Sequence, residues 1–297
     1  MEKSHSRHWA IGALILLAMI WGYNWVFMKV AVRYASPFDF AAMRAFYGSL
    51  CLFLLLIVQG RSIHPRALAG TFWYGVLQSG ATIGLATWAL VSGGAGKTAV
   101  LTYTMSFWTL LFAWVFLGEN LRRRQWTSLS IAAAGLILVL IPFTLSSALF
   151  SKGLAILAGV AWASASIVLK KLDHTKRVDP VVFTAWQMLF GSLPLIVVSL
   201  LVPSAPVQWT PEFWGVLIYN VIPGSAIAWL LWFYALRHLS TDTASLGALL
   251  TPVLSIPFAA LQLSEIPSTT EFLGIGLILI ALVVNASRPA GIGQPEP

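Results

Sequence analysis

The sequence predicts an all-α membrane protein of ten transmembrane helices, arranged as two inverted repeats of five helices each. Three observations predict this fold. Of the 297 residues, 58% are hydrophobic and only 9% are charged, whereas a soluble domain carries roughly 25% charged residues. The apolar residues form ten runs, each near the length of about 20 residues that a helix needs to cross a bilayer. The second half of the chain also repeats short patterns of the first half.

The ten apolar runs divide equally between the two halves of the chain. They lack the alternation over about 10 residues that marks a membrane β-strand. The runs of the first half cover residues 9–32, 38–59, 68–91, 98–117 and 126–145. The runs of the second half cover residues 152–172, 180–202, 211–236, 243–263 and 269–287. We therefore expect a cytoplasmic N-terminal segment, two five-helix repeats and a disordered cytoplasmic tail, over residues 1–8, 9–145, 152–287 and 288–297.

Similar segments recur at a nearly constant offset. An offset of 146 residues relates Leu117–Glu119 to Leu263–Glu265, and an offset of 141 relates Trp21 to Trp162. A unit of five spans begins and ends on opposite sides of the membrane, so its second copy is inverted relative to the first. Inverted repeats place a substrate site near the midplane between the copies and allow the opening to alternate. The pattern therefore favours a transporter.

The basic residues predict that both termini are cytoplasmic, and we expect the multi-pass chain to lie in the cell inner membrane. With the N-terminus inside, 13 of the 18 lysines and arginines fall in cytoplasmic segments and 4 on the opposite side. Short cytoplasmic loops carry such an excess of Lys and Arg. The first apolar run is too long for the apolar part of a signal peptide, and it contains Asn24. We expect it to be retained as the first helix.

Charged residues are almost absent from the predicted spans. Every Asp and Glu lies near a span end, in a loop or in a tail, and Arg44 is the exception at depth. An ionisable residue within a membrane span is a functional candidate. Arg44 could contact a substrate carboxylate or a gating partner such as Asp39, or it could extend to the membrane surface or pack helices. The shortage of buried acids argues against a carboxylate proton relay and favours facilitated diffusion, with coupling by a route that the sequence does not show as the alternative.

Aromatic and neutral polar residues suggest a substrate cavity. Trp21 and Trp162 fall near the middle of spans, away from the interfacial belts where Trp is enriched. Because the repeat relates them, they are expected on opposite walls of one cavity, with core packing as the alternative. Neutral polar side chains could bind a zwitterion, or could only satisfy backbone carbonyls and join helices. The candidate substrate-binding residues are Trp21, Asn24, Gln78, Ser79, Thr82, Tyr103, Trp162, Ser166, Ser225, Trp229 and Ser245.

Backbone-breaking residues predict where the spans bend. A proline removes an N–H donor and frees a carbonyl of the preceding turn. Pro223 and Gly224 fall within the eighth span, and Pro252 and Pro257 fall within the ninth. Breaks of this kind tend to lie at the hinges and binding sites of transporters. Together with Arg44, these four residues are the candidate hinge or gating residues.

Motifs of enzymes and metal sites are absent from the sequence. It holds no HExxH, no GxSxG and no phosphate-binding loop. The single cysteine, Cys51, excludes an intrachain disulfide and any CxxC motif. The net charge of +8 comes from basic residues spread over short loops, so it does not indicate nucleic-acid binding. We expect no enzymatic activity, no cofactor and no metal, with a small-molecule substrate and the lipid bilayer as partners.

Short motifs at corresponding places in the two halves resemble those of a known family. In the first half they are Leu117–Glu119, Gln125 and Gly135. In the second half they are Tyr234–Leu236, Thr251–Val253 and Leu263–Glu265. On these motifs the chain resembles the EamA-type branch of the drug/metabolite transporter superfamily over about residues 9–287. Arg44 matches an arginine that this family often shows in its second helix, although Gln187 stands where the repeat would place a second copy of Arg44.

The resemblance implies an exporter of small metabolites that works by alternating access, with spans 1, 3, 4, 6, 8 and 9 around a central cavity. The chain is most similar to the aromatic amino-acid exporters of this group, which implies aromatic or other neutral amino acids as substrates. A multidrug, quaternary-ammonium or osmolyte transporter is an alternative, since lipophilic cations could contact Trp21 and Trp162 through cation–π interactions. A membrane scaffold or channel without turnover is a third alternative.

Overall fold

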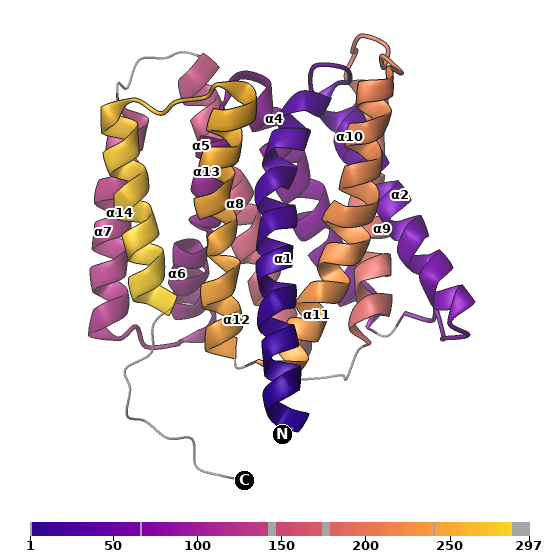
Figure 1. Ribbon diagram of the computed structural model, residues 1–297, viewed down its shortest axis with the longest axis horizontal. Helices are drawn as coiled ribbons and strands as arrows, with labels where there is room; N and C mark the ends of the chain where they lie inside the picture. Colours follow the sequence, from indigo (N-terminus) through magenta and orange to yellow (C-terminus); the bar gives the residue numbers. More distant parts are fainter. Residues whose placement is uncertain (1, 66, 142–146, 174–178, 240, 287–297) are drawn as a thin grey trace.

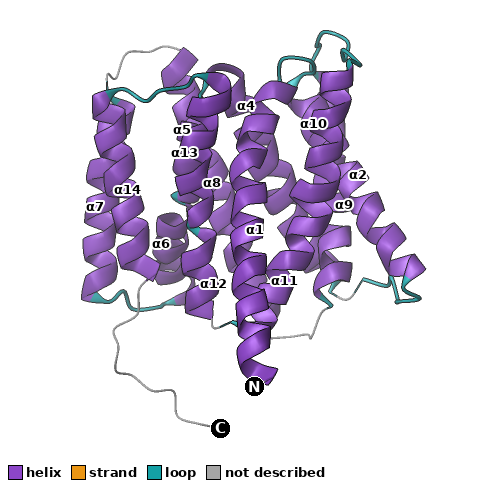
Figure 2. Cartoon of the chain, in the orientation of Figure 1, coloured by secondary structure: helices purple, strands orange, loops and turns teal. Residues whose placement is uncertain are grey.

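The computed structural model describes residues 2–65, 67–141, 147–173, 179–239 and 241–286. The predicted tail of residues 288–297 lies outside these ranges. Helices make up almost all of the described chain, and no strand occurs among the described residues (Figure 2). The helix α1 begins at Glu2, so most of the predicted N-terminal segment extends the first helix.

The first repeat contains five spans, two of which are divided. The first two spans are α1 (Glu2–Ala31) and α2 (Pro37–Val58). The third span consists of α3 (Leu68–Gly75), a π-helical segment η1 (Val76–Ala81) and α4 (Thr82–Ser92). The fourth span consists of α5 (Ala95–Tyr103) and α6 (Met105–Leu117), and the fifth is α7 (Arg123–Leu140).

The second repeat has the same plan. The sixth and seventh spans are α8 (Ser147–Asp173) and α9 (Pro180–Leu201). The eighth span consists of α10 (Pro211–Val221), a π-helical segment η2 (Ile222–Ile227) and α11 (Ala228–His238). The ninth span consists of α12 (Thr241–Ala248) and α13 (Leu250–Leu263), and the tenth is α14 (Thr269–Ala286). The prediction of ten helices in two five-helix repeats is confirmed.

Within the described ranges, seven helical segments are long and apolar enough to cross a membrane, and they correspond to spans 1, 2, 4, 6, 7, 8 and 10. The other three spans are more polar or shorter. The third span carries Gln78 and Ser79, the fifth begins with two arginines, and the ninth is divided at Leu249. The fifth and ninth spans nevertheless run through the thickness of the bundle beside the other spans (Figure 1).

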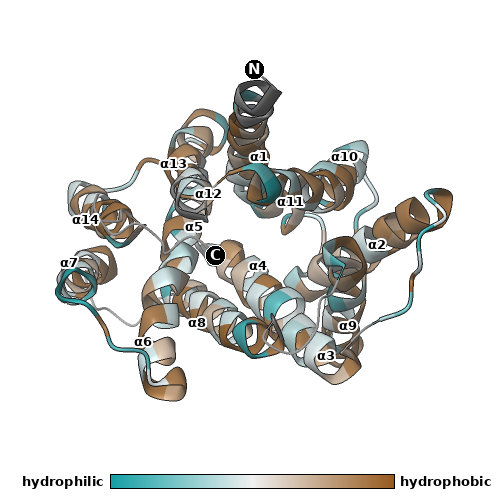
Figure 3. Cartoon of the chain, turned by 90° about the horizontal axis from the view of Figure 1, so that it is seen from below, coloured by the Kyte–Doolittle hydropathy of each residue, from teal (hydrophilic) through white to brown (hydrophobic). Residues whose placement is uncertain are grey.

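The two repeats run in opposite directions through the bundle. The start of α1 and the end of α14 lie on the same side, at the bottom of Figure 1, which we call the terminal side. The helix α8, which opens the second repeat, begins at the opposite side (Figure 1). Seen from the terminal side, α7 and α14 lie together at one edge of the bundle, and the other helices surround the centre (Figure 3).

The two π-helical segments occupy equivalent positions in the repeats. Val76–Ala81 and Ile222–Ile227 are related by the same offset of 146 residues that relates the ends of spans 4 and 9. Pro223 accounts for the second segment, because it cannot donate to the preceding turn. The first segment has no proline, and Thr82 Oγ1 donates to the carbonyl of Leu77 at 2.9 Å. The sequence therefore predicted only one of the two irregularities.

The prediction that Pro252 and Pro257 interrupt the ninth span is wrong in position. The interruption lies at Leu249, and α13 runs through both prolines. Pro252 is the third residue of α13, where a missing N–H costs little because the first N–H groups of a helix have no partner within it. Pro252 therefore sits just inside a new helix. The fourth span breaks at the equivalent Thr104 without a proline.

Helix α9 meets the third span through a contact between glycine backbones. A Cβ atom added at Gly75 would lie 2.3 Å from the carbonyl oxygen of Gln187, and one added at Gly191 would lie 2.5 Å from that of Gly75. Both distances are far below van der Waals contact. Small residues that allow such close approach are typical of helix interfaces in membranes.

We expect Gly75→Ala to destabilise the protein by about 1–3 kcal/mol or more, because the added methyl group must push two backbones apart. The melting temperature of the purified protein in detergent measures the effect. The matched control is Gly276→Ala on α14, where a Cβ would meet no atom within 4 Å. A Gly75→Ala protein that melts with the wild type would show that this interface is not closely packed.

Candidate functional site

A buried cavity lies between the two repeats. It has two compartments, and the inner compartment has a volume of about 100 Å³. Helices of both repeats contribute to its walls, including α1, α2 and η1 from the first and α8, α9 and η2 from the second. The polar and aromatic residues that line the inner compartment are Trp21, Asn24, Trp25, Arg44, Gln78, Ser79, Thr82, Thr102, Tyr103, Trp162, Ser225 and Trp229.

The wide compartment has a volume of about 560 Å³ and extends toward the terminal side. Its wall includes Leu172, Pro180 and Leu236, which lie near the terminal-side ends of α8, α9 and α11. Four aromatic residues line both compartments, so their side chains lie where the two compartments adjoin. These residues are Trp21, Tyr103, Trp162 and Trp229.

The aromatic rings are fixed by contacts with one another and with the irregular part of span 8. The ring of Trp21 packs edge-on against that of Trp229, with centroids 5.8 Å apart. The ring of Trp162 packs against that of Tyr103 at 5.9 Å. Trp21 Nε1 donates to the carbonyl of Gly224 at 3.1 Å. A buried indole needs such an acceptor, and the π-helical segment provides one beside the cavity.

Ten of the eleven predicted substrate-binding residues line one or both compartments. The side chain of the eleventh, Ser245, lies outside the described part of the structure. Three of the ten use their hydroxyl groups to bond a carbonyl of their own helix, as the alternative interpretation expected. These are Thr82, Ser166 and Ser225.

Only some of the polar atoms of the amide side chains in the cavity form hydrogen bonds with described residues. Ser79 Oγ donates to Gln187 Oε1 at 2.8 Å, which joins the third span to the seventh. Asn24 Nδ2 donates to the sulfur of Met28 at 3.3 Å. Asn24 Oδ1 and Gln78 Oε1 are buried and find no hydrogen-bond partner among the described residues. Buried polar atoms without partners are rare in folded proteins, so these two oxygens are available to a ligand or to water.

Arg44 lies at the wall of the inner compartment and is only 7% exposed. The alternative that its side chain extends to the membrane surface is therefore wrong. Asp39 is not its partner either, because that carboxylate accepts hydrogen bonds from Ser199 and Ser204. Arg44 Nη1 donates to the sulfur of Met28 at 3.1 Å, and no described acid forms an ion pair with Arg44.

The predicted hinge residues lie at or near the cavity to different degrees. Gly224 lines the inner compartment, where a Cβ atom would lie 2.7 Å from Asn24 Oδ1. Pro223 is half-buried in the same π-helical segment. Pro252 and Pro257, on α13, line neither compartment.

Sequence reasoning left Trp25, Met28 and Met188 out of the candidate set, although all three line the inner compartment. Trp25 and Met28 follow Trp21 at the spacing of one helix face, so the sequence itself places them on the face of Trp21. Met188 has no such signal, because its counterpart in the first repeat does not share its chemistry.

An apolar cluster closes the bundle on the side opposite the termini. It gathers buried residues from the ends of α1, α2, α4 and α10 that lie on that side. Representative members are Ala31, Phe40, Leu90 and Phe213, each 0% exposed. The cavity is therefore covered on the opposite side and reaches toward the terminal side.

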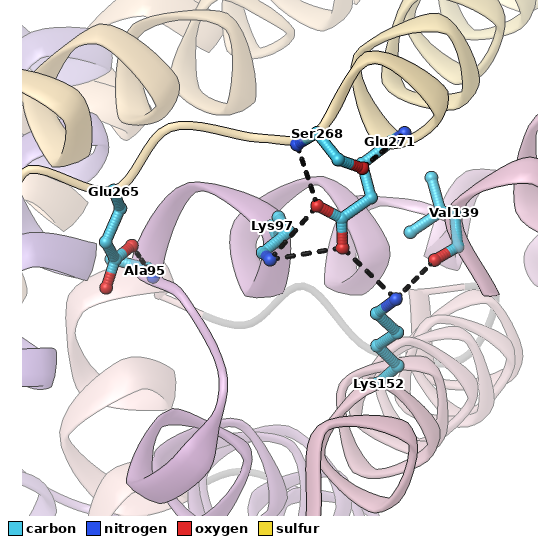
Figure 4. A network of polar contacts seen from close by, with 7 residues as sticks. All are labelled: Ala95, Lys97, Val139, Lys152, Glu265, Ser268 and Glu271. Atoms are coloured by element: carbon cyan, nitrogen blue, oxygen red, sulfur yellow. Dashed lines mark hydrogen bonds and ion pairs between the residues drawn. The ribbon is translucent and has the colours of Figure 1, made fainter. Parts of the chain in front are cut away.

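A partly buried ionic network joins four helices on the same closed side (Figure 4). Lys97 Nζ and Lys152 Nζ both lie 3.1 Å from Glu271 Oε1. Lys152 Nζ also donates to the carbonyl of Val139 at 2.5 Å, so the network connects α5, α7, α8 and α14. Nearby, Glu265 accepts a hydrogen bond from the backbone N–H of Ala95 at 2.6 Å, at the start of α5.

The comparisons with known proteins match this architecture. The EamA-like transporter family matches residues 8–141 and, a second time, residues 150–287. The chain belongs to the EamA-like transporter family. It is therefore a membrane transporter built from two copies of one unit.

Relatives of this EamA-like transporter align over almost its whole length. The uncharacterized transporter YoaV of Bacillus subtilis is 29% identical over 92% of this chain and 94% of its own length. The uncharacterized inner membrane transporter YedA of Escherichia coli is 26% identical over 92% of this chain and 89% of its own. A probable amino-acid metabolite efflux pump of Escherichia coli is 26% identical over 91% of this chain and 92% of its own.

A solved crystal structure shares the fold of this EamA-like transporter, with a TM-score of 0.66 over 93% of this chain and 94% of the other. The sequences are 17% identical, so the likeness concerns the fold alone. No group of three or more His, Cys, Asp or Glu side chains that could hold a metal ion occurs among the described residues.

Proposed function

We propose that this transporter exports neutral amino acids with aromatic or other bulky apolar side chains across the cell inner membrane. The observation that carries the proposal is the composition of the cavity wall. Four aromatic rings surround the junction of the two compartments, and Arg44 is the only charged residue among the described residues that line either one. Ligand pockets of this kind are mostly apolar, with a few polar groups that set orientation.

The charge of the cavity favours amino acids over the alternative of lipophilic cations. Sites for quaternary ammonium groups rely on aromatic rings, and the rings of Trp21 and Trp162 meet that need. However, a cation would enter a space that contains the guanidinium of Arg44 and no described carboxylate. Repulsion between like charges is strong where water is excluded, so the wall suits a ligand that carries a carboxylate.

The shape of the cavity and the distribution of basic residues support loading of the substrate from the cytoplasm. The wide compartment reaches the terminal side, which the positive-inside rule predicts to be cytoplasmic. A substrate would therefore load from the cytoplasm and leave when the opposite side opens, by alternating access. The name of the Escherichia coli efflux pump agrees with export of an amino-acid metabolite.

The residues that line the two compartments also support facilitated diffusion as the transport mechanism. A proton-coupled carrier needs a group that gains and loses a proton during the cycle, and intramembrane Asp, Glu or His side chains serve this role. No Asp, Glu or His lines either compartment in the described structure. We therefore propose that the substrate gradient alone drives export.

The test is counterflow in liposomes that contain the purified protein and are preloaded with one amino acid. We expect saturable exchange of phenylalanine or tryptophan whose rate does not respond to an imposed pH gradient. Empty liposomes are the control. Exchange of tetraphenylphosphonium or a quaternary ammonium dye, without exchange of any amino acid, would replace the proposal by the multidrug alternative. A rate that follows the pH gradient would contradict facilitated diffusion.

A further inference from the structure

Two hydrogen-bond donors converge on one weak acceptor at the wall of the inner compartment. Arg44 Nη1 lies 3.1 Å from the sulfur of Met28, and Asn24 Nδ2 lies 3.3 Å from the same atom. All three side chains line the compartment, and each is less than 10% exposed. The donors come from different helices, α2 and α1, which fixes the point at which they meet.

The thioether cannot satisfy these donors. A methionine sulfur is a weak acceptor, whereas a guanidinium carries five N–H groups and a permanent positive charge. A buried charge without a partner is costly, and proteins normally pair it with an opposite charge. Arg44 has no such partner among the described residues, and a ligand with a carboxylate would supply the missing negative charge.

Arg44 has no second copy in the other repeat, so this site fixes the orientation of a bound ligand. The position equivalent to Arg44 in the second repeat holds Gln187, whose Oε1 accepts a hydrogen bond from Ser79. Arg44 lines the small inner compartment and is absent from the wall of the wide one. An acid group bound at Arg44 therefore leaves its side chain to extend between the four aromatic rings toward the wide compartment.

The described residues that line the two compartments provide no comparable site for an ammonium group. Asp and Glu are missing from the described walls of both compartments, and the amide oxygens of Asn24 and Gln78 are neutral acceptors. An ammonium group would also add a second positive charge near Arg44. The wall thus provides a strong site for the carboxylate of an amino acid and only weak contacts for its amino group.

We propose that Arg44 and Asn24 form a carboxylate subsite, and that the transporter accepts aromatic monocarboxylates whether or not they carry an ammonium group. Its substrates would then include 2-oxo and 2-hydroxy acids with aromatic side chains besides the amino acids themselves. Aromatic amines and amides, which lack the carboxylate, are excluded. The inference rests on the proposed function, because it places the aromatic part of the ligand in the same cavity.

The experiment measures inhibition of labelled phenylalanine counterflow by four compounds with the same ring. Two keep the carboxylate and lack the ammonium group, 3-phenylpropionate and 3-phenyllactate. Two keep the ammonium group and lack the carboxylate, phenethylamine and phenylalaninamide. We expect the acids to inhibit at concentrations near that of phenylalanine, and the amines to need at least about 10-fold more, as the loss of a charge-assisted hydrogen bond predicts. Equal inhibition by acids and amines would overturn the inference.

The subsite itself is tested by Arg44→Gln, which we expect to weaken inhibition by phenylalanine and 3-phenylpropionate by about 10- to 100-fold. Arg44→Lys keeps the charge but loses the planar fork that pairs with a carboxylate, so its effect should be intermediate. The control is Arg33→Gln, which removes an exposed arginine outside both compartments. Unchanged inhibition in Arg44→Gln would remove the subsite.

Failure of the inference can be told apart from failure of the proposed function. If wild-type protein exchanges phenylalanine but Arg44→Gln behaves like the wild type, only the subsite is wrong. If the wild type exchanges no amino acid, the proposed function fails. The shift of melting temperature by 3-phenylpropionate in detergent then tests the subsite without transport. A shift in the wild type that disappears in Arg44→Gln supports it, and no shift in the wild type overturns it.

Discussion

Alanine in place of Trp21 or Trp162 is expected to lower amino-acid counterflow by about 10-fold or more in each case, while the amount of protein in the membrane stays unchanged. The two indole rings line both compartments, one from α1 and one from α8. A large apolar side chain contributes about 1.5–3 kcal/mol when it buries a partner surface, and about 1.4 kcal/mol corresponds to a factor of ten in affinity.

The control for these variants is Trp126→Ala. Trp126 lies on α7, is 46% exposed and packs against Trp114, away from both compartments. We expect wild-type counterflow from this variant. Counterflow at the wild-type rate in both Trp21→Ala and Trp162→Ala would show that the compartments are not the transport route.

A second substitution separates the two contacts of Trp21. Trp21→Phe keeps a ring beside Trp229 but removes the hydrogen bond from Nε1 to the carbonyl of Gly224. If the ring alone matters, Trp21→Phe should transport far better than Trp21→Ala. If it transports as poorly as Trp21→Ala, the link between α1 and the π-helical segment of span 8 is the important contact.

Glu271→Gln is expected to cause the largest loss of stability, because it leaves Lys97 and Lys152 close together without a counter-charge. Removal of one partner from a buried ion pair costs about 3–5 kcal/mol. We expect the lower end of this range, since the side chain of Lys97 is 30% exposed. The melting temperature of the purified protein measures the loss.

The matched control is Glu212→Gln, which removes an exposed carboxylate from the first turn of α10. It should change the melting temperature little, since exposed charges contribute at most about 1 kcal/mol. The triple variant Lys97→Met, Lys152→Met and Glu271→Gln should recover much of the lost stability, because no unpaired charge remains. If the single and triple variants are equally destabilised, packing and not charge explains the effect.

The number of spans, their inversion and the family resemblance are properties of the sequence. The offset of 146 residues between Leu117–Glu119 and Leu263–Glu265 also relates the π-helical segments η1 and η2. The repeat likewise identified Trp21 and Trp162 as a pair, and both line the cavity. These features could be predicted because they depend on runs of apolar residues and on the repeat, and both can be recognised in the sequence directly.

The direction in which each side chain points was decided by the tertiary structure. In a membrane, lipid-facing and interior surfaces are both apolar, so the periodicity of a span says little about which face is buried. The sequence therefore left the surface position of Arg44 as an alternative, although the side chain lines the inner compartment.

Some of the irregular helical segments could be predicted from the sequence, and the others depend on the tertiary structure. Pro223 marked the π-helical segment of span 8, because a missing N–H is visible in the sequence. The segment at Val76–Ala81 and the breaks at Thr104 and Leu249 carry no such residue at the point of interruption. They depend on side chains and neighbouring helices that satisfy the freed backbone groups. The sequence alone determined where the helices run and that they repeat, and the packing of those helices decided which residues meet in the cavity.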